Sequence, residues 1–151
     1  MSQALEWQTS AFDALTPAIL YRAIKLRQDI FILEQECLYT DLDDLDQQAT
    51  HMLCWRAGAL VAYQRCLPPG VSYPESSIGR IIVTPEVRGI QLGRQLVQRG
   101  IDYNLAQWPD HDIKIGAQSH LQPFYNSLGF TTVGEEYLED GIMHAPMLYQ
   151  R

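Results

Sequence analysis

Apolar residues recur at two spacings along the chain, and the change between them predicts an alternation of strands and helices. The β-branched residues at positions 81–83 form a short apolar run that is typical of a buried strand. Pro85 ends this strand because proline has no N–H for a ladder of hydrogen bonds. A helix over residues 90–107 is predicted next, from apolar residues at helical spacing: Leu92, Leu96, Val97 and Ile101. Residues 113–117 form the following strand, and this strand–helix–strand order predicts that it lies parallel to the strand at 81–83 and beside it.

The rest of the chain predicts five further strands and two further helices. The strand-like runs occupy residues 4–9, 51–57, 60–67, 130–138 and 143–149. The second and third runs are expected to form one hairpin, and the last two another around Glu139-Asp140-Gly141. Thr16-Pro17 begins a helix over residues 18–33, and a short helix occupies residues 120–128. We therefore expect an α/β (α+β) fold with a mixed, largely antiparallel sheet, in a single domain over residues 1–151.

Composition narrows the class of protein and its partners. The 151 residues carry a formal net charge of −7, which argues against nucleic acid as a partner because duplex binding depends on Lys and Arg. The apolar runs are too short to cross a bilayer, and the N-terminus has no basic region followed by an apolar stretch, so we expect no membrane and no secretory signal. Cys37, Cys54 and Cys66 contain no Cys-x-x-Cys pair and are expected to be reduced thiols in a cytoplasmic protein.

The turn between the strand at 81–83 and the helix after it carries the strongest chemical signal. Residues 88–93 are a glycine-bearing turn at a helix start, where backbone N–H groups are unpaired and the helix dipole is positive. Phosphate is the usual ligand of such a terminus. Four basic residues gather between positions 77 and 100: Arg80, Arg88, Arg94 and Arg99. The turn is neither a P-loop nor a dinucleotide fingerprint, because it lacks both the Lys-Ser/Thr ending and the Gly-x-Gly-x-x-Gly spacing.

Residues 34–46 are strongly acidic and contain no Lys or Arg. The acids are Glu34, Glu36, Asp41, Asp43, Asp44 and Asp46. The stretch is interpreted as a solvated loop or as a negative rim that attracts a cationic substrate. A calcium loop is disfavoured because the central glycine and closing glutamate of an EF-hand are missing. The four histidines show no zinc-like spacing, and no metal is expected.

Two motifs together resemble the GCN5-related N-acetyltransferases (GNAT). This family carries Arg/Gln-x-x-Gly-x-Gly/Ala at the mouth of a long helix, which Arg88 and Gly93 match, whereas Gln91 stands where the middle glycine is usual. The downstream motif Asn-x-x-Ala-x-x-Leu-Tyr-x-x-x-Gly-Phe is matched by Tyr125, Gly129 and Phe130, with Gln118 in the asparagine position. The chain is most similar to the ElaA branch, at residues 26–35, 39–43, 78–83, 116–118, 120–125 and 139–144.

The resemblance implies a cosubstrate and a set of binding residues. It implies acetyl-coenzyme A, with its pyrophosphate on the turn and its pantetheine arm along the edge of the strand at 81–83, and with Val83 N–H as the oxyanion donor. The implied cofactor-binding residues are Ile81, Ile82, Val83, Arg88, Gly89, Ile90, Gln91, Leu92, Gly93, Arg94 and Gln118. Tyr125 is the implied general acid for the departing thiolate.

The resemblance further implies direct transfer of acetyl to an amine in a ternary complex. An alkylammonium has a pKa near ~10 and must lose a proton before it attacks. Glu34, His120 and His144 are candidate bases, directly or through water. His120 precedes Tyr125 by five residues at the same strand end, and Glu34 ends the first predicted helix, where it could instead bind the amine.

We therefore predict an acetyl-CoA-dependent N-acetyltransferase that acts on a primary amine of a small cationic or peptide acceptor. One alternative is an enzyme with a longer acyl donor or a hydroxyl acceptor. A second alternative is a non-catalytic CoA-binding regulatory module. A nucleotide-binding α/β protein is the alternative that the sequence supports least. Terminal strands in this family often pair between subunits, so the resemblance is compatible with a homodimer.

Overall fold

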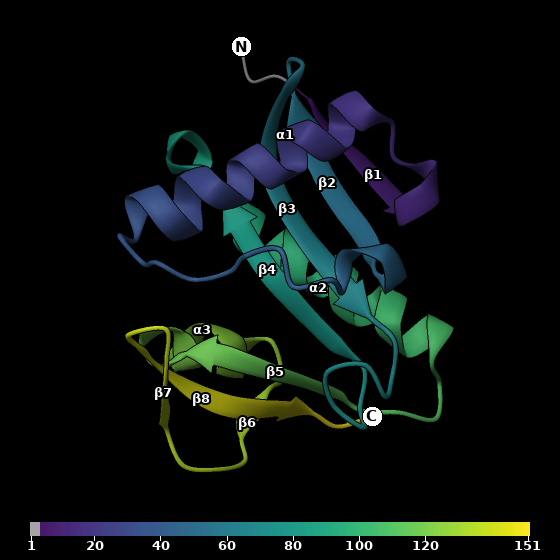
Figure 1. The fold of residues 1–151 in the computed structure, drawn as a ribbon. Coiled ribbons are helices and arrows are strands. Elements are labelled where there is room, and N and C mark those ends of the chain that lie inside the picture. Colours follow the sequence, from purple (N-terminus) through teal and green to yellow (C-terminus); the bar gives the residue numbers. More distant parts are fainter. Residues whose placement is uncertain (1–3) are drawn as a thin grey trace.

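Two β-sheets and the helices that cover them make up the computed structural model, which describes residues 4–151 (Figure 1). The first sheet is antiparallel, with the order β1 (Leu5–Ala11), β2 (Thr50–Arg56), β3 (Ala59–Leu67) and β4 (Ser77–Val83). In the second sheet, β8 (Ile142–Tyr149) pairs with β5 (Ile113–Gln118), β6 (Thr131–Thr132) and β7 (Tyr137–Glu139). The expected α/β fold with largely antiparallel sheets is confirmed.

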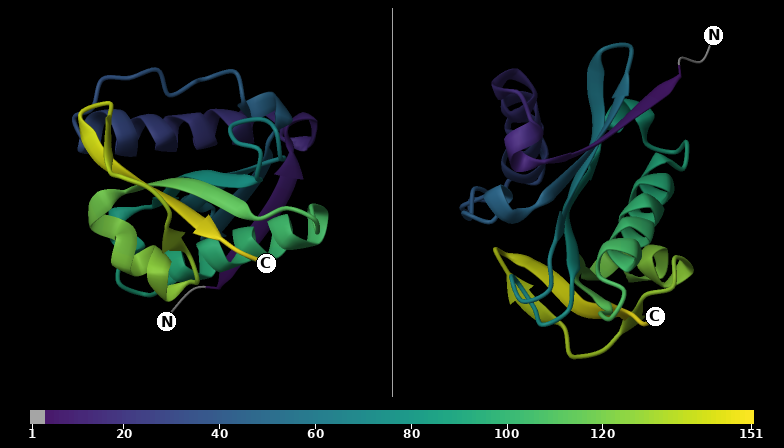
Figure 2. Two further views of the ribbon diagram at one scale, coloured as in Figure 1. Left: turned by 90° about the horizontal axis from the view of Figure 1, so that it is seen from below. Right: turned by 90° about the vertical axis from the view of Figure 1, so that its right-hand side faces the viewer.

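Two long helices cover opposite faces of the first sheet (Figure 2). α1 (Pro17–Arg27) begins where expected, and the Thr16 side chain caps it by accepting the Ile19 N–H at 3.2 Å. The predicted helix at 18–33 changes type within its length, because α1 continues as the π-helix η2 (Gln28–Glu34). On the other face, α2 (Leu92–Gln107) ends at the predicted residue.

Short helical segments complete the chain. They are η1 (Phe12–Ala14), η3 (Asp46–Gln48), η4 (Pro85–Val87), η5 (Ser119–Leu121) and α3 (Gln122–Ser127). Proline lies in the first turn of α3, and Gly129 follows the helix at a φ of +109°, as a helix stop requires. No helix in the described part of the chain is long and apolar enough to cross a membrane.

The prediction that the strand at 113–117 pairs along the strand at 81–83 is only partly right. β4 and β5 run parallel, but just one bridge joins them, between Ser76 and Ile113. Ser76 N–H donates to the Asp112 carbonyl at 3.1 Å, and Lys114 N–H donates to the Ser76 carbonyl at 2.8 Å. Beyond this bridge the two strands belong to different sheets and diverge, as Figure 1 shows.

The prediction of one continuous strand over residues 130–138 is wrong. The segment contains the short β6 and β7 with a loop between them, and both pair with β8. The turn that follows β7 is as predicted: Asp140 and Gly141 have φ values of +51° and +81°, the left-handed pair of a tight hairpin turn.

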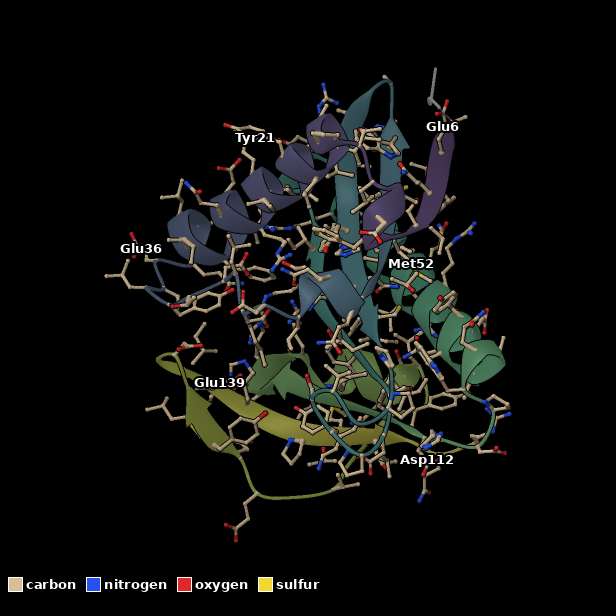
Figure 3. All side chains as sticks on the ribbon, turned by 45° about the vertical axis from the view of Figure 1, so that its right-hand side comes forward. Glu6, Tyr21, Glu36, Met52, Asp112 and Glu139 are labelled. Carbon is tan, nitrogen blue, oxygen red and sulfur yellow. The ribbon has the colours of Figure 1, made fainter. Side chains whose placement is uncertain are left out.

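The core lies on both faces of the first sheet. On the α1 side, Ala23 packs with Leu53, Tyr63 and Ile82, and on the α2 side, Leu96 packs with Ala62 and Val87. A third cluster lies where α2, α3 and the second sheet meet, and includes Ile101, Tyr125 and Phe130. Met52 points into this interior, whereas Tyr21 and Glu36 point outward (Figure 3). All three cysteines are buried free thiols.

Candidate functional site

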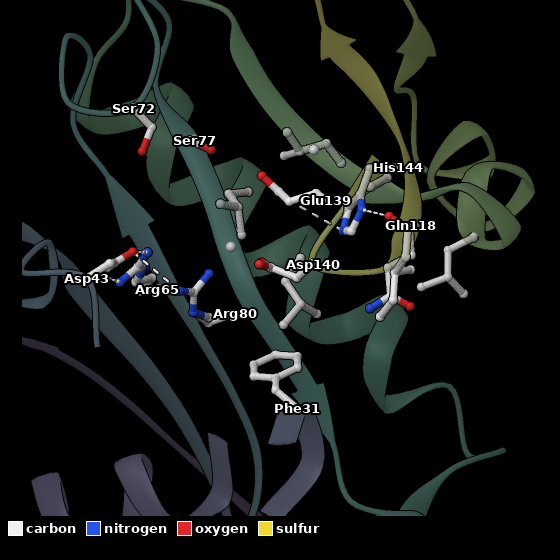
Figure 4. A pocket seen from close by; sticks show the side chains of 18 of the residues that line it. Phe31, Asp43, Arg65, Ser72, Ser77, Arg80, Gln118, Glu139, Asp140 and His144 are labelled. Carbon is white, nitrogen blue, oxygen red and sulfur yellow. Dashed lines mark hydrogen bonds and ion pairs between the residues drawn. The ribbon is translucent and has the colours of Figure 1, made fainter. Parts of the chain in front are cut away.

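A polar cavity of about 300 Å³ lies where β4 and β5 diverge (Figure 4). β4 supplies Ile81 to its wall, β5 supplies Gln118, and Tyr125 enters from α3. Phe31 of the π-helix and the residues after it cover one side. The opposite side is formed by the β7–β8 turn, which carries Glu139, Asp140 and His144.

A bulge in β4 accompanies the divergence of the two sheets. Tyr63 pairs with Ile82 and Arg65 pairs with Gly79, so two residues of β4 stand opposite Gln64. Arg80 is one of these two and has a φ of +52°, which is a left-handed conformation for a residue with a side chain. Because a bulge bends its strand and interrupts the ladder, it turns the end of β4 away from β5.

Arg80 is held in this conformation by residues 41–43. Its Nε donates to Asp41 Oδ1 at 2.8 Å and its Nη2 donates to the Asp41 carbonyl at 2.9 Å. Asp41 also accepts Arg27 Nε at 2.9 Å, and Arg27 in turn donates to Asp46. Arg65 completes the network through Asp43 and Asp46. Arg27 and Arg65 are almost fully buried, so these carboxylates neutralise charges that have no access to bulk water.

Three aspartates of the acidic stretch at 34–46 therefore belong neither to a solvated loop nor to a negative rim for a substrate. Asp41, Asp43 and Asp46 neutralise three arginines inside the protein. Arg27 and Arg65 did not figure among the sequence-predicted site residues. The signal in the sequence was an arginine within an apolar helix face and another in an apolar strand.

The turn after β4 has the backbone conformation of a glycine-rich loop. Gly89 has a φ of +93° and Gln91 a φ of +65°, so Gln91 adopts the left-handed conformation that a glycine would supply. No side chain caps α2, which leaves its first N–H groups without a side-chain acceptor. Gly93 packs with ordinary contacts against Val83 and Phe124, with room for a Cβ 3.6 Å from Val83 Cγ2.

The backbone of Val83 faces the opening between the sheets. Thr84 N–H donates to the Val61 carbonyl on β3 at 2.9 Å. Because N–H groups alternate between the two edges of a strand, the Val83 N–H faces the side where β5 has diverged. By the same alternation Ile82 faces β3, and its side chain is buried beside Tyr63. Ile82 therefore lies away from the opening, unlike Val83 and Ile81.

The predicted group of four arginines is dispersed by the fold. Arg88 lies at the turn, where its Nη1 donates to Glu34 Oε1 at 2.7 Å and its Nε donates to the Val83 carbonyl. Arg94 Nη1 donates to Ser127 Oγ at 2.7 Å. Arg99 stacks on the Trp7 ring. Arg80 belongs to the buried arginine–aspartate network around Asp41. Only Arg88 and Arg94 remain close to the predicted anion site.

The candidate acid and bases occupy different places. Tyr125 lines the cavity with 6% of its surface exposed, and burial raises its pKa to about 12. Glu34 is paired with Arg88, and His120 is exposed, so neither is part of the cavity lining. His144 does line it. Among residues 4–151, no group of three or more His, Cys, Asp or Glu is placed to hold a metal ion.

The arrangement offers binding groups for an extended substrate that carries phosphate at one end. An unpaired strand edge with an inward N–H can bind an extended arm and a developing oxyanion. The uncapped start of α2 next to it can bind phosphate. A buried tyrosine with a raised pKa stays protonated at neutral pH and can donate a proton.

Comparison with known proteins agrees with this geometry. Residues 24–151 match the family model described as an acetyltransferase (GNAT) domain. Protein ElaA of Escherichia coli is 41% identical over 95% of both chains, and a UPF0039 protein of Synechocystis is 37% identical over 97% of this chain and 96% of its own.

Two solved structures superpose closely on this chain. The crystal structure of E. coli ElaA does so with a TM-score of 0.91 at 38% identity, covering 97% of this chain and all of that one. An acyl-CoA N-acyltransferase from Pseudomonas aeruginosa does so with a TM-score of 0.90 at 36% identity, covering 96% of this chain and 99% of that one. The chain belongs to the GNAT family of acyltransferases, in its ElaA branch.

Proposed function

We propose that residues 1–151 form one acetyl-CoA-dependent N-acetyltransferase domain. It transfers acetyl from the thioester to a primary amine of a small cationic or peptide acceptor, by direct attack in a ternary complex. The observation that carries this proposal is the divergence of β4 and β5 at the Arg80 bulge, with the Val83 N–H directed away from β3 and Tyr125 in the lining of the cavity. Family membership supports acyl transfer, and the cavity supports an acceptor of modest size.

On the donor side, the turn and the free edge of β4 bind the cosubstrate. Backbone N–H groups of residues 89–94 take the pyrophosphate, with charge from Arg88 and Arg94. Leu92 contributes through its backbone alone, because its side chain is buried in the core. The edge at Ile81 and Val83 pairs with the pantetheine arm, and Gln118 contributes from the facing strand.

On the reacting side, Val83 and Tyr125 act on the two products of thioester cleavage. The Val83 N–H donates to the oxygen that becomes negative as the amine attacks, and one such donor contributes about 3 kcal/mol of transition-state stabilisation. Tyr125 gives its hydroxyl proton to the sulfur as the C–S bond breaks. Its surroundings of Phe124 and Phe130 rings stabilise the neutral phenol.

The structure gives less support to Glu34 and His120 as bases. Glu34 is occupied by Arg88, and its two carboxylate oxygens lie 2.7 and 3.2 Å from the guanidinium nitrogens. His120 precedes α3 on the outer surface. A base that faces the cavity is a better candidate than either of them.

Calorimetric titration with acetyl-CoA, with ATP and NAD as controls, tests the donor. We expect micromolar binding of acetyl-CoA alone, followed by thiol release when primary amines are added. If a longer acyl-CoA binds more tightly than acetyl-CoA, the longer acyl group is the one transferred. Binding of acetyl-CoA without thiol release would favour a non-catalytic regulatory module. Failure to bind, or equal binding of ATP, would contradict the proposal.

A further inference from the structure

His144 faces the cavity from the β7–β8 hairpin, in the position of a base for the acceptor. Its register partner across the sheet is Gln118 on β5, and both side chains line the cavity (Figure 4). The imidazole is stacked on the Tyr137 ring at 5.8 Å between centroids, and only 12% of the side chain is exposed. The ring is therefore held in one orientation by packing.

The backbone next to His144 fixes which ring nitrogen is free. Nδ1 lies 2.8 Å from the Ile142 carbonyl oxygen. A carbonyl can only accept, so Nδ1 carries the proton of the neutral ring and donates it to this bond. Nε2 then has an unprotonated lone pair. That is the form of imidazole that can accept a proton.

The carboxylate nearest to His144 Nε2 is that of Glu139, and the two groups are not in direct contact. Glu139 Oε2 lies 3.7 Å from Nε2, which is too long for a direct hydrogen bond. Both groups are therefore available to a third partner, and an ammonium group can donate to the carboxylate and the imidazole at once. The side chain of Asp140 lines the cavity next to Glu139.

Charge balance favours this end of the cavity for a cation. At the other end, Asp43 is opposed by Arg65 and Arg80. At the hairpin end, Glu139 and Asp140 have no arginine or lysine partner among residues 4–151. Among the acidic residues that line the cavity, those without an arginine or lysine partner in the described part of the chain therefore lie on the β7–β8 turn.

We propose that His144 is the general base of the acetyl transfer and that Glu139, with Asp140, binds the acceptor as a cationic primary amine; this rests on the function proposed above. His144 Nε2 takes one proton from the ammonium group, and the amine lone pair attacks the thioester carbon. The C–N bond forms and the C–S bond breaks. Tyr125 protonates the sulfur and is reprotonated by the second proton that the nitrogen loses. The products are an amide, a thiol and one proton, which leaves from His144.

The kinetic test compares His144→Gln with His111→Gln, which alters an exposed histidine outside the cavity. Cadaverine, tyramine and lysinamide serve as probes, and thiol release is measured with the amine that the wild type acetylates fastest. We expect His144→Gln to lower kcat/KM about 100-fold near pH 7 without changing the Kd of acetyl-CoA. His111→Gln is expected to match the wild type.

The pH dependence separates a base from a structural residue. As the pH approaches ~10, a growing fraction of the amine is already deprotonated in solution. The difference in kcat/KM between the wild type and His144→Gln should therefore narrow. A residue that only supports the fold would give the same deficit at every pH. The groups that face His144 are Glu139, Asp140 and Tyr137, so the profile is repeated in Glu139→Gln, which should raise KM for cadaverine but leave the Kd of acetyl-CoA unchanged.

A spectroscopic test needs no acceptor. Long-range proton–nitrogen NMR spectra of the free protein, assigned with His144→Gln, should show the neutral ring protonated at Nδ1. A proton on Nε2 would overturn the proposal. So would acetylation that His144→Gln supports as fast as the wild type at all pH values, or binding of acetyl-CoA without acetylation of any probe. Failure of the wild type to bind acetyl-CoA would instead overturn the proposed function on which the inference rests.

Discussion

Arg80 Nε and Asp41 Oδ1 lie 2.8 Å apart, and this contact joins the bulge of β4 to the loop that covers the cavity. A left-handed conformation costs a residue with a side chain roughly 1–2 kcal/mol. The two bonds from Arg80 to Asp41, together with the stacking of its guanidinium on Tyr39, offset this cost. The strand divergence that forms the site is therefore stabilised by contacts 39 residues apart in the chain.

Replacement of Asp41 by alanine should destabilise the protein strongly. It leaves the arginines of the network with only Asp43 and Asp46 as carboxylate partners, so one buried positive charge is no longer balanced, and removing one partner of a buried pair costs about 3–5 kcal/mol. Urea denaturation measures the change. Asp44→Asn is the matched control, because Asp44 is exposed. Equal midpoints for the two variants would contradict the role of the network.

Stability should fall in two stages as the pH is lowered. Burial lowers the pKa of His51, so its neutral folded form loses stability once the pH falls below the unfolded value of about 6.5. Burial alone would raise the pKa of Asp43, but the hydrogen bonds and charge of Arg65 outweigh it and lower that pKa to about 2. Asp43 therefore stabilises the fold above the unfolded value of about 3.9, and this contribution is lost between about pH 4 and pH 2.

Urea midpoints at a series of pH values, in the wild type and in Asp43→Asn, test this account. The variant should be less stable at neutral pH and should lose less between about pH 4 and pH 2. His51→Gln should remove the part of the loss that begins near about pH 6.5. A wild-type urea midpoint that stays constant from neutral pH down to about pH 2 would contradict the roles given to His51 and Asp43.

The local structure was predictable because neighbouring residues determine it. The Asp140-Gly141 turn, the Thr16 cap and the end of α2 follow from turn chemistry, capping and periodicity within a few positions. The turn at residues 88–93 was predictable too, although Gln91 replaces the usual glycine, because the strand and the helix on either side fix its direction.

The long-range parts were not predictable from the pattern. The charges of Asp41, Asp43 and Asp46 suggest solvent or a substrate, and nothing local indicates that Arg27, Arg65 and Arg80 neutralise them. The parallel order of β4 and β5 was predictable from the crossover, but their divergence depends on the bulge at Arg80. His144 could be named as a candidate base, but its free Nε2 depends on a bond to Ile142 in the folded hairpin.

Gly100 to alanine should destabilise α2 even though alanine is the better helix former. A Cβ there would lie 2.6 Å from Gln64 Nε2 and 2.9 Å from Ile78 Cδ1. Gln64 is unable to move aside freely because its Nε2 donates to the Leu96 carbonyl at 2.8 Å. Overpacking costs about 1–3 kcal/mol, against a gain in propensity of about 1. Gly93→Ala is the control, because a Cβ there would make only ordinary contacts, and its urea midpoint should rise. A change of the urea midpoint in the same direction in both variants would contradict the packing argument.

Gln91 to valine should weaken both stability and acetyl-CoA binding. A β-branched residue is strained at a φ of +65°, and we expect a loss of about 1–2 kcal/mol. Gln91→Gly removes the strain and should keep or improve binding. Calorimetry with acetyl-CoA and urea denaturation measure the two effects. Equal binding by the valine and glycine variants would show that the left-handed conformation is not needed for the donor.

Tyr125 to phenylalanine should separate binding from chemistry. Tyr125 packs at ring distances of 5.1 and 5.9 Å against Phe124 and Phe130, and phenylalanine preserves this packing. The variant should therefore keep its stability and its Kd for acetyl-CoA. Its rate near neutral pH should fall by about 10²–10⁴-fold, because the thiolate loses its proton donor. Because burial raises the pKa of Tyr125 to about 12, the wild-type rate should show no loss from tyrosine ionisation below about pH 10. An unchanged rate in the variant would remove Tyr125 from the mechanism and leave protonation of the thiolate to water.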